Sequence, residues 1–390
     1  MSRILFVSNG HGETAIAERI AVELRAIRPD ARADHLALVG EAPAGEMLEV
    51  GPRRRMPSGG LIAMGNVRNL ARDLRAGLLA LTWDQMRFLR RARGEYDAVV
   101  AVGDVYALGM ALRARTPTVF VGSAKSVAVA PYGRFEAAVL ARAAACFVRD
   151  EPTATLLRRQ GVKAEAANAI VDLFATRPEV SVEPVVAGFD PALALFPGSR
   201  ERAYGDAGFL LEVTAELATS RPALGGVLSV AAGLDADRFA RDALRAGWTV
   251  RAGADESIPF VLSRDGRAIV RAWRGPLGPL IARVALVLGQ AGTANEAAAA
   301  GGVPVVAFER GSDREAHWYR QRQQGLLGDS LAVLPRERKD AVSGVSALLD
   351  DPARQKRMGE IGRERMGEPG GTRRIAQRIA TFLEGSQCDV

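Results

Sequence analysis

Short runs of β-branched and other apolar residues alternate with helical patterns along nearly the whole chain, and this rhythm restricts the possible folds most strongly. The expected strands of the first half are residues 4–8, 35–39, 98–102, 118–121, 145–148 and 164–167. Those of the second half are residues 192–196, 226–230, 248–251, 269–273, 284–288, 303–307 and 331–334. Such alternation is typical of parallel sheets built from right-handed β-α-β units.

A proline-bearing stretch, residues 177–191, interrupts this rhythm and is typical of a linker. We therefore predict an N-terminal Rossmann-like domain over residues 1–176 and a C-terminal one over residues 192–370. Residues 371–390 are expected to form a helix that returns toward the first domain. Ligands of doubly wound sheets bind beyond the carboxyl ends of the strands, so we expect the site to face a cleft between the domains.

The composition excludes several classes of protein. The two cysteines, Cys146 and Cys388, lie far apart, which is typical of free thiols in a reducing cytoplasm. We find no signal peptide and no apolar run of ~18 residues, so we expect a cytoplasmic protein. The net charge of +7 would suit nucleic acid, anionic lipid or phosphorylated small molecules. Because aromatic residues make up only 6% and no zinc-finger or RNP pattern occurs, we do not expect nucleic acid as a partner.

The most informative motif spans residues 284–306 and indicates a buried strand, a glycine-rich turn, a short helix and a second strand. Gly289 and Gly292 would let the backbone approach a ligand closely, and Gln290 lies between them. These residues are candidates for ligand binding.

The helix of this motif begins near Thr293 and Ala294, where free amide groups and the helix dipole attract phosphate. Glu296 follows one turn later, and its carboxylate can accept hydrogen bonds from both hydroxyls of a ribose. The alternative is an ordinary strand–helix turn with Thr293 as N-cap, but that alternative does not explain an acidic residue in an otherwise alanine-rich helix.

A second loop, Gly198, Ser199 and Arg200, follows the first expected strand of the C-terminal domain. Its amides, hydroxyl and guanidinium suit a pyrophosphate, which arginine binds well because its donors are planar and always charged. A solvated arginine in a surface turn is an equally good interpretation.

The N-terminal glycine-rich loop contains Asn9, Gly10, His11, Gly12 and Glu13. A histidine there can titrate near neutral pH, so His11 is a candidate base, while a role in shaping the turn is the alternative. We expect Asn9, Gly10, Gly12 and Glu13 to bind an acceptor. A dinucleotide-binding loop is less consistent, because the second expected strand does not end on an acidic residue.

Asp104 follows another strand and is a second candidate base, although capping of the next helix would also explain it. Asp235 and Asp237 form an Asp-x-Asp pair before a helical pattern, and we expect capping there as well. We therefore predict neither a metal site nor a cofactor.

Taken in order along the chain, these motifs resemble those of bacterial lipid-A-disaccharide synthase and its relatives, which are GT-B glycosyltransferases. The resemblance rests on the first glycine-rich loop and on residues 63–65, 102–104, 197–200 and 292–296. It implies that a UDP-sugar is the donor. The first loop departs from the family pattern Gly-Glu-x-Ser-Gly-Asp, which leaves the acceptor open.

The resemblance also implies roles for individual residues. Arg200 would contact the diphosphate, Glu296 the ribose, and Asp104 would be the catalytic base. Trp273 would lie beside the uracil, unless it is a core residue. The family also places an acidic or amide pair near residues 313–321 against the donor sugar, although a charged helix start explains that segment equally well.

Residues 66–93 form a long helical pattern with Leu70, Leu74, Leu78 and Leu81 on one face. Basic residues lie on the neighbouring face, and aromatic residues follow. Such a helix suits an anionic membrane surface, whereas a core-packed helix with a solvated face is the alternative.

The function predicted from the sequence is an inverting, metal-independent transfer of sugar from a UDP-sugar to a lipid-linked or glycolipid acceptor. It would take place in the cytoplasm or at the inner face of the cytoplasmic membrane. The alternatives are a UDP-N-acetylglucosamine 2-epimerase and a non-catalytic nucleotide-binding protein associated with the membrane. The sequence leaves the oligomeric state open.

Overall fold

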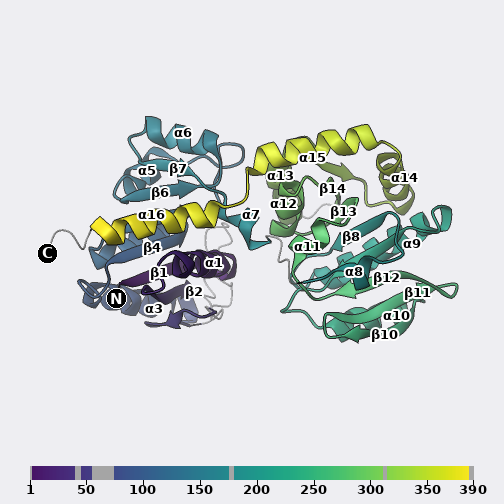
Figure 1. Cartoon of the computed structure of the whole chain (residues 1–390), viewed down its shortest axis with the longest axis horizontal. Coiled ribbons are helices and arrows are strands. Elements are labelled where there is room, and N and C mark those ends of the chain that lie inside the picture. Colours follow the sequence, from purple (N-terminus) through teal and green to yellow (C-terminus); the bar gives the residue numbers. More distant parts are fainter. Residues whose placement is uncertain (1, 40–44, 55–73, 175–179, 311–313, 386–390) are drawn as a thin grey trace. The chain divides into compact units, whose positions relative to one another are not determined.

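The computed structural model describes residues 2–39, 45–54, 74–174, 180–310 and 314–385 of the chain. The fold comprises two compact units, Met1–Leu173 with Pro369–Val390 as unit 1, and Phe174–Glu368 as unit 2 (Figure 1). Each of the strands expected from the sequence is present.

Unit 1 is built on a parallel sheet of seven strands in the order β3-β2-β1-β4-β5-β6-β7. The strands are β1 (Arg3–Asn9), β2 (Arg32–Val39), β3 (Leu48–Glu49), β4 (Ala98–Gly103), β5 (Thr118–Gly122), β6 (Ala145–Val148) and β7 (Ala164–Ala166). The helices are α1 (His11–Ile27), α3 (Leu78–Arg91), α4 (Val105–Ala111), α5 (Arg134–Leu140), α6 (Glu151–Arg159), α7 (Ala169–Leu173) and α16 (Gly371–Gly385). The central strands read as near-continuous apolar runs because helices cover both faces of such a sheet.

Helix α16 comes from the far end of the chain and packs along α1 (Figure 1). Its apolar residues recur at helical spacing and are buried in the same core cluster as those of α1; they are Ile375, Ala376, Ile379, Ala380 and Leu383. The last helix is therefore part of unit 1.

Unit 2 contains an eight-stranded sheet in the order β10-β11-β12-β9-β8-β13-β14-β15. The strands are β8 (Ala192–Phe196), β9 (Gly225–Ser229), β10 (Thr249–Asp255), β11 (Ile258–Arg264), β12 (Arg267–Trp273), β13 (Leu286–Gly289), β14 (Val305–Phe308) and β15 (Leu331–Leu334). The helices are α8 (Glu183–Val186), α9 (Ala203–Ser220), α10 (Ala236–Arg245), α11 (Leu277–Ile281), α12 (Thr293–Ala300), α13 (Arg314–Leu327), α14 (Arg338–Leu349) and α15 (Pro352–Met366).

The outer edge of this second sheet is antiparallel, which the sequence analysis did not predict. Strand β11 pairs antiparallel with both β10 and β12. Asp265 and Gly266 connect β11 to β12 with φ angles of 50° and 75°. Both residues are left-handed, as a two-residue hairpin turn of type I′ requires, and Asp-Gly is a preferred pair for it. The local signal was therefore present in the sequence.

The strand order of each sheet reverses at one point. In unit 1 the chain leaves β1 for β2 on one side and returns to β4 on the other. In unit 2 the same reversal occurs between β8 and β13. Loops that follow the two strands at such a point diverge and leave space for a ligand. The fold therefore predicts a ligand site at each of these two positions.

Two helices begin elsewhere than the sequence suggested. Helix α1 begins at His11, so the glycine-rich loop is reduced to a turn at Gly10 with φ 130°. Helix α3 begins only at Leu78, because Gly77 with φ 90° interrupts the long pattern expected over residues 66–93. Much of that pattern, residues 66–73, lies outside the described residues.

Candidate functional site

The two loops singled out in the C-terminal half line one pocket of about 550 Å³ in unit 2. The first loop follows β8 and the second follows β13, the two strands at the reversal point. The candidate residues that line this pocket are Gly198, Ser199, Arg200, Gln290, Gly292, Thr293 and Glu296. Residues distant in sequence thus share a single cavity.

The pocket borders the start of helix α12. That helix begins at Thr293 and follows Gly292, which has no side chain to cap it. Thr293 is therefore the first helical residue, and its interpretation as N-cap is wrong. The first amides of an α-helix have no partner within the helix and carry a partial positive charge, so this edge of the pocket suits an anion.

Arg200 is exposed, and its side chain forms no hydrogen bond or ion pair with any residue that the structure describes. Gly198, with φ 116°, turns the loop sharply after β8. The guanidinium is thus available to a ligand at the mouth of the pocket.

Three of the candidate residues do not line the pocket. Trp273 is buried in the core and donates its indole N–H to the Pro276 carbonyl at 3.0 Å, in keeping with the core interpretation. Ala294 is buried within α12. Gly289 lies against Asn295, whose Oδ1 would be 1.9 Å from a Cβ at this position. The close approach that requires glycine at 289 is therefore to a side chain of the protein.

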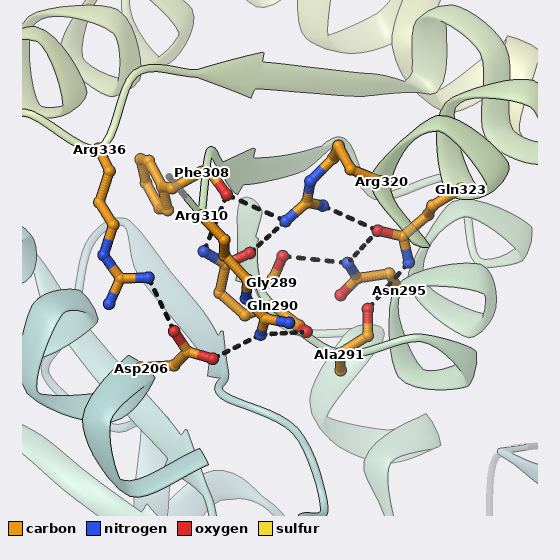
Figure 2. Close-up of polar contacts among 10 residues, drawn as sticks. All are labelled: Asp206, Gly289, Gln290, Ala291, Asn295, Phe308, Arg310, Arg320, Gln323 and Arg336. Atoms are coloured by element: carbon orange, nitrogen blue, oxygen red, sulfur yellow. Dashed lines mark hydrogen bonds and ion pairs between the residues drawn. The ribbon is translucent and has the colours of Figure 1, made fainter. Parts of the chain in front are cut away.

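Residues of α13 complete the pocket (Figure 2). The sequence predicted only an acidic or amide pair near residues 313–321, so the roles of Arg320 and Gln323 were missed. Gln323 is buried and donates to the carbonyls of Ala291 and Gly292 at 2.8 and 3.3 Å. Its Oε1 accepts from the Asn295 amide at 3.3 Å, and that same amide donates to the Gly289 carbonyl at 3.1 Å. The peptide carbonyls of the turn are thus fixed by side chains of α12 and α13.

Arg320 lies one turn before Gln323 on α13 and also lines the pocket. It donates to Oε1 of Gln323 at 3.0 Å, to the Phe308 carbonyl at 3.0 Å and to Oε1 of Gln290. Burial, together with the nearby Arg310 cation, lowers the pKa of Arg320 to about 10. The i, i+3 spacing of Arg320 and Gln323 was the available signal, because it puts both on one face of a helix.

A separate cluster neutralises two other arginines. Asp206 is buried and accepts from Arg336 at 2.9 Å and from Arg310, which also donates to the Gln290 carbonyl at 3.0 Å. With Arg202 and Gly205 these residues line an adjoining cavity of about 450 Å³. Arg310 therefore has a carboxylate partner, whereas Arg320 is held by neutral oxygens (Figure 2).

The candidate residues of unit 1 gather at the carboxyl ends of β1 and β4. The Asp104 carboxylate caps α4 by accepting from the Ala107 amide at 3.0 Å, and its other oxygen accepts from the Asn9 side chain at 3.1 Å. The capping interpretation of Asp104 is thus correct. Glu13 accepts a 3.4 Å hydrogen bond from Ser123, which follows β5.

Burial is the main cause that raises the pKa of Glu13, and the charge of Asp104 raises it further. Two hydrogen bonds that the carboxylate accepts, one from its own backbone amide and one from Ser123, partly offset this rise. Gly10 lies directly against the carboxyl group, since a Cβ there would be 2.8 Å from Glu13 Oε2. A carboxyl group with a raised pKa beside a second carboxyl group is a common arrangement for acid–base chemistry.

The structure gives fewer contacts for the other candidate residues of the acceptor side. Gly12 is exposed in the first turn of α1. The side chain of His11 lies outside what the structure describes, so its role as base stays a prediction. Asp235 caps α10 by accepting from the Asp237 amide at 2.9 Å, as expected. Among the described residues no group of three or more potential metal ligands occurs.

Helix α3 buries Leu78 and Leu81, two of the leucines expected on the apolar face, and exposes other apolar residues. Leu79 is 71% exposed and Trp83 is 56% exposed. None of the described helices combines the length and apolarity needed to cross a bilayer.

No protein-family model matches this chain, and no curated protein matches its sequence. Solved structures match nearly its whole length. The UDP-GlcNAc 2-epimerase of Neisseria meningitidis, bound to UDP-GlcNAc, is 13% identical with a TM-score of 0.59, covering 97% of this chain and 100% of that one. CalG4, the calicheamicin glycosyltransferase, is 17% identical with a TM-score of 0.58, covering 98% of both chains.

MurG of Acinetobacter baumannii is 13% identical with a TM-score of 0.51, covering 98% of this chain and 100% of that one. At such low identity the likeness defines a fold. The chain has the GT-B type of fold, with two parallel-dominated α/β sheets, which confirms the fold class predicted from the sequence.

Proposed function

We propose that this protein is an enzyme that binds a UDP-sugar and transfers the sugar to a lipid-linked or glycolipid acceptor, in the manner of lipid-A-disaccharide synthase. One observation carries the proposal: the loops after β8 and β13 line a single pocket beside the start of α12. Three of the fold neighbours were solved with UDP, UDP-GlcNAc or both bound, which supports a UDP-sugar for this pocket.

In the proposed complex, Arg200 and the first amides of α12 hold the diphosphate, and Glu296 accepts hydrogen bonds from the ribose hydroxyls. Ser199 and Gly198 contribute the turn that carries Arg200. The same positive groups stabilise the charge that develops on the leaving diphosphate, so the proposal needs no metal ion.

The reaction on the acceptor side needs a base. In the proposed step a carboxylate takes the proton of the acceptor hydroxyl, and the hydroxyl oxygen bonds to the anomeric carbon with inversion. The bond from that carbon to the UDP oxygen breaks, and its electron pair leaves with UDP. Asp104 and Glu13 supply two carboxyl groups at one sheet edge, and His11 is a further candidate at the same edge.

We propose that the acceptor is lipid-linked because apolar side chains are exposed on neighbouring elements of unit 1. Leu79 and Trp83 lie on α3, Tyr106 lies on α4 and Phe135, 79% exposed, lies on α5. Helix α4 contacts both α3 and α5, so these residues occupy adjoining elements. Arginines at the end of α3 add positive charge, which suits the anionic inner face of the cytoplasmic membrane.

A second candidate function is the epimerisation of UDP-N-acetylglucosamine at carbon 2. It is supported by the fold likeness to several epimerases of that sugar nucleotide. The same pocket would hold the substrate, and the reaction would need no lipid.

The test is incubation of the purified chain with UDP-sugars, with and without membrane lipid extract, followed by product analysis. Transfer of sugar to lipid supports the first function, whereas an epimerised UDP-sugar formed without lipid supports the second. A non-catalytic nucleotide-binding protein would bind UDP without any turnover, and Asp104→Ala would leave that binding unchanged.

The Arg200→Ala variant is expected to lose about 2 kcal/mol of transition-state stabilisation, or roughly 30-fold in turnover. Arg245→Ala is the matched control, because Arg245 is an exposed arginine on α10 that does not line the pocket. Equal effects of the two variants would contradict the proposed role of the pocket.

A further inference from the structure

Arg320 lines the proposed diphosphate pocket and is partly buried, yet its guanidinium has no carboxylate ion pair among the residues that the structure describes. Its donors go to two side-chain amide oxygens and one backbone carbonyl, those of Gln323, Gln290 and Phe308. These neutral acceptors fix its position without cancelling its charge.

An uncompensated cation in such a place is costly. Removal of a charge from water raises its free energy, and a nearby opposite charge is what normally offsets this cost. Asp206 is the one carboxylate that acts on Arg320 appreciably, and its effect is smaller than those of burial and of Arg310. The depressed pKa of Arg320 is the outcome of these effects.

The neighbouring arginines show how the same fold neutralises a partly buried cation elsewhere. Arg310 and Arg336 share the buried Asp206 carboxylate (Figure 2). Two carboxylates line the pocket itself, but Glu201 pairs with Arg238, and Glu296 is not among the charges that act appreciably on Arg320. Of the three arginines drawn in Figure 2, Arg320 is thus the one without a carboxylate partner among the described residues.

We propose that Arg320 is the specificity residue by which this pocket selects a phosphate-bearing ligand, and that the ligand supplies the missing negative charge. This inference rests on the proposed function and adds to it a residue that acts through its charge. A neutral nucleoside gains nothing from an uncompensated cation, whereas a nucleoside diphosphate or inorganic pyrophosphate does.

The inference is tested by placing the missing carboxylate inside the protein. In Gln290→Glu, an isosteric carboxylate replaces the amide whose Oε1 accepts from Arg320. The Phe308 carbonyl loses the Gln290 donor but keeps the one from Arg320 at 3.0 Å. Gln290→Met is the uncharged control: like Gln290→Glu it loses the hydrogen bond to the Phe308 carbonyl, and it also loses the acceptor for Arg320 without adding a charge.

Binding of uridine, UDP and inorganic pyrophosphate is measured by calorimetry with the full chain. We expect Gln290→Glu to weaken UDP and pyrophosphate binding by about 10-fold or more beyond Gln290→Met, and to bind uridine as that control does. Arg320→Lys keeps the charge and is expected to retain most of the preference for UDP over uridine.

The inference is wrong if Gln290→Glu and Gln290→Met lower the preference for UDP over uridine equally, or if Arg320→Lys abolishes that preference. In either case Arg320 only holds the turn after β13 in position. The proposed function fails separately, if the folded wild-type chain binds no UDP or if Arg200→Ala binds UDP as well as the wild type does. Pyrophosphate tests the charge alone, because it lacks the nucleoside.

Discussion

Asp172 and Thr372 lie 200 residues apart in the sequence and are joined by two hydrogen bonds. The buried Asp172 carboxylate accepts from the Thr372 amide at 2.6 Å and from its hydroxyl at 2.8 Å, and also from the Gly370 amide at 2.7 Å. These amides belong to the start of α16, which has no earlier turn to bind them. The carboxylate therefore anchors the last helix to unit 1.

Replacement of Asp172 by alanine is expected to lower the free energy of unfolding by about 1–3 kcal/mol, because a buried and a partly buried amide lose their acceptor. Urea denaturation measures the change. Asp351→Ala is a suitable comparison, since Asp351 caps α15 at an exposed position and should cost only ~1 kcal/mol. Equal losses in the two variants would contradict the anchoring role of Asp172.

Gly289→Ala is expected to destabilise unit 2, because its Cβ would lie 1.9 Å from Asn295 Oδ1. Overpacking of this kind costs about 1–3 kcal/mol. The double variant with Asn295→Ala removes the clash. It should therefore be destabilised by less than the sum of the losses in the two single variants. Simple additivity in thermal unfolding would show that the two side chains do not compete for this space.

Glu13→Gln should separate stability from turnover. The raised pKa of Glu13 means that folding disfavours its charged form, so the cost appears as the pH rises through that pKa. A neutral amide carries no such cost and cannot serve as a base. The variant should therefore unfold at slightly higher temperature at neutral pH and lose turnover by about 10²–10⁴-fold.

For the wild type we expect turnover to fall as the pH drops through the raised pKa of Glu13, because a base must be ionised. This acid limb should be missing from the residual activity of Glu13→Gln. UDP affinity of the variant should match that of the wild type, since Glu13 belongs to unit 1 and the pocket to unit 2. An unchanged pH profile would exclude Glu13 as the base.

We predict that His35 makes unit 1 less stable at acid pH. It is buried, its Nε2 lies 2.8 Å from the Ser8 hydroxyl, and burial lowers its pKa to about 4. Folding favours the neutral form of His35. Its contribution to the free energy of unfolding is therefore complete above pH 6.5, the ordinary pKa of histidine, and is lost as the pH falls to about 4.

The loss for His35 is expected to reach at most about 3 kcal/mol. His35→Gln, which does not titrate, should show a flatter decline of stability over that pH range in urea denaturation. A decline as steep as that of the wild type would place the acid sensitivity in other groups.

Membrane contact is tested by changing Leu79 and Trp83 together to serine. Because both side chains are exposed, the change should leave the fold intact and weaken binding to vesicles that contain anionic lipid. Leu244→Ser is the control, since Leu244 is 60% exposed on α10 of unit 2. Vesicle co-sedimentation that is equal for the wild type and the double variant would contradict membrane contact through α3.

Local patterns were sufficient for the fold class. Buried parallel strands leave apolar runs that are visible in the sequence, and the runs over residues 145–148, 192–196 and 331–334 coincide with β6, β8 and β15. Glycine-rich turns after such strands indicate where a ligand can approach, so the loops at residues 198–200 and 290–293 could be predicted from the sequence, and both line the pocket. The Asp265-Gly266 hairpin was equally local and was overlooked.

Only the tertiary structure decided which residues meet around those loops. The contacts of Arg320 and Gln323 with the turn after β13, and of Asp172 with α16, join segments that are distant in sequence. No local periodicity encodes such pairs, because they depend on how helices pack against a sheet. Whether Trp273 faced a ligand or the core was settled in the same way, since that depends on the space left by its neighbours.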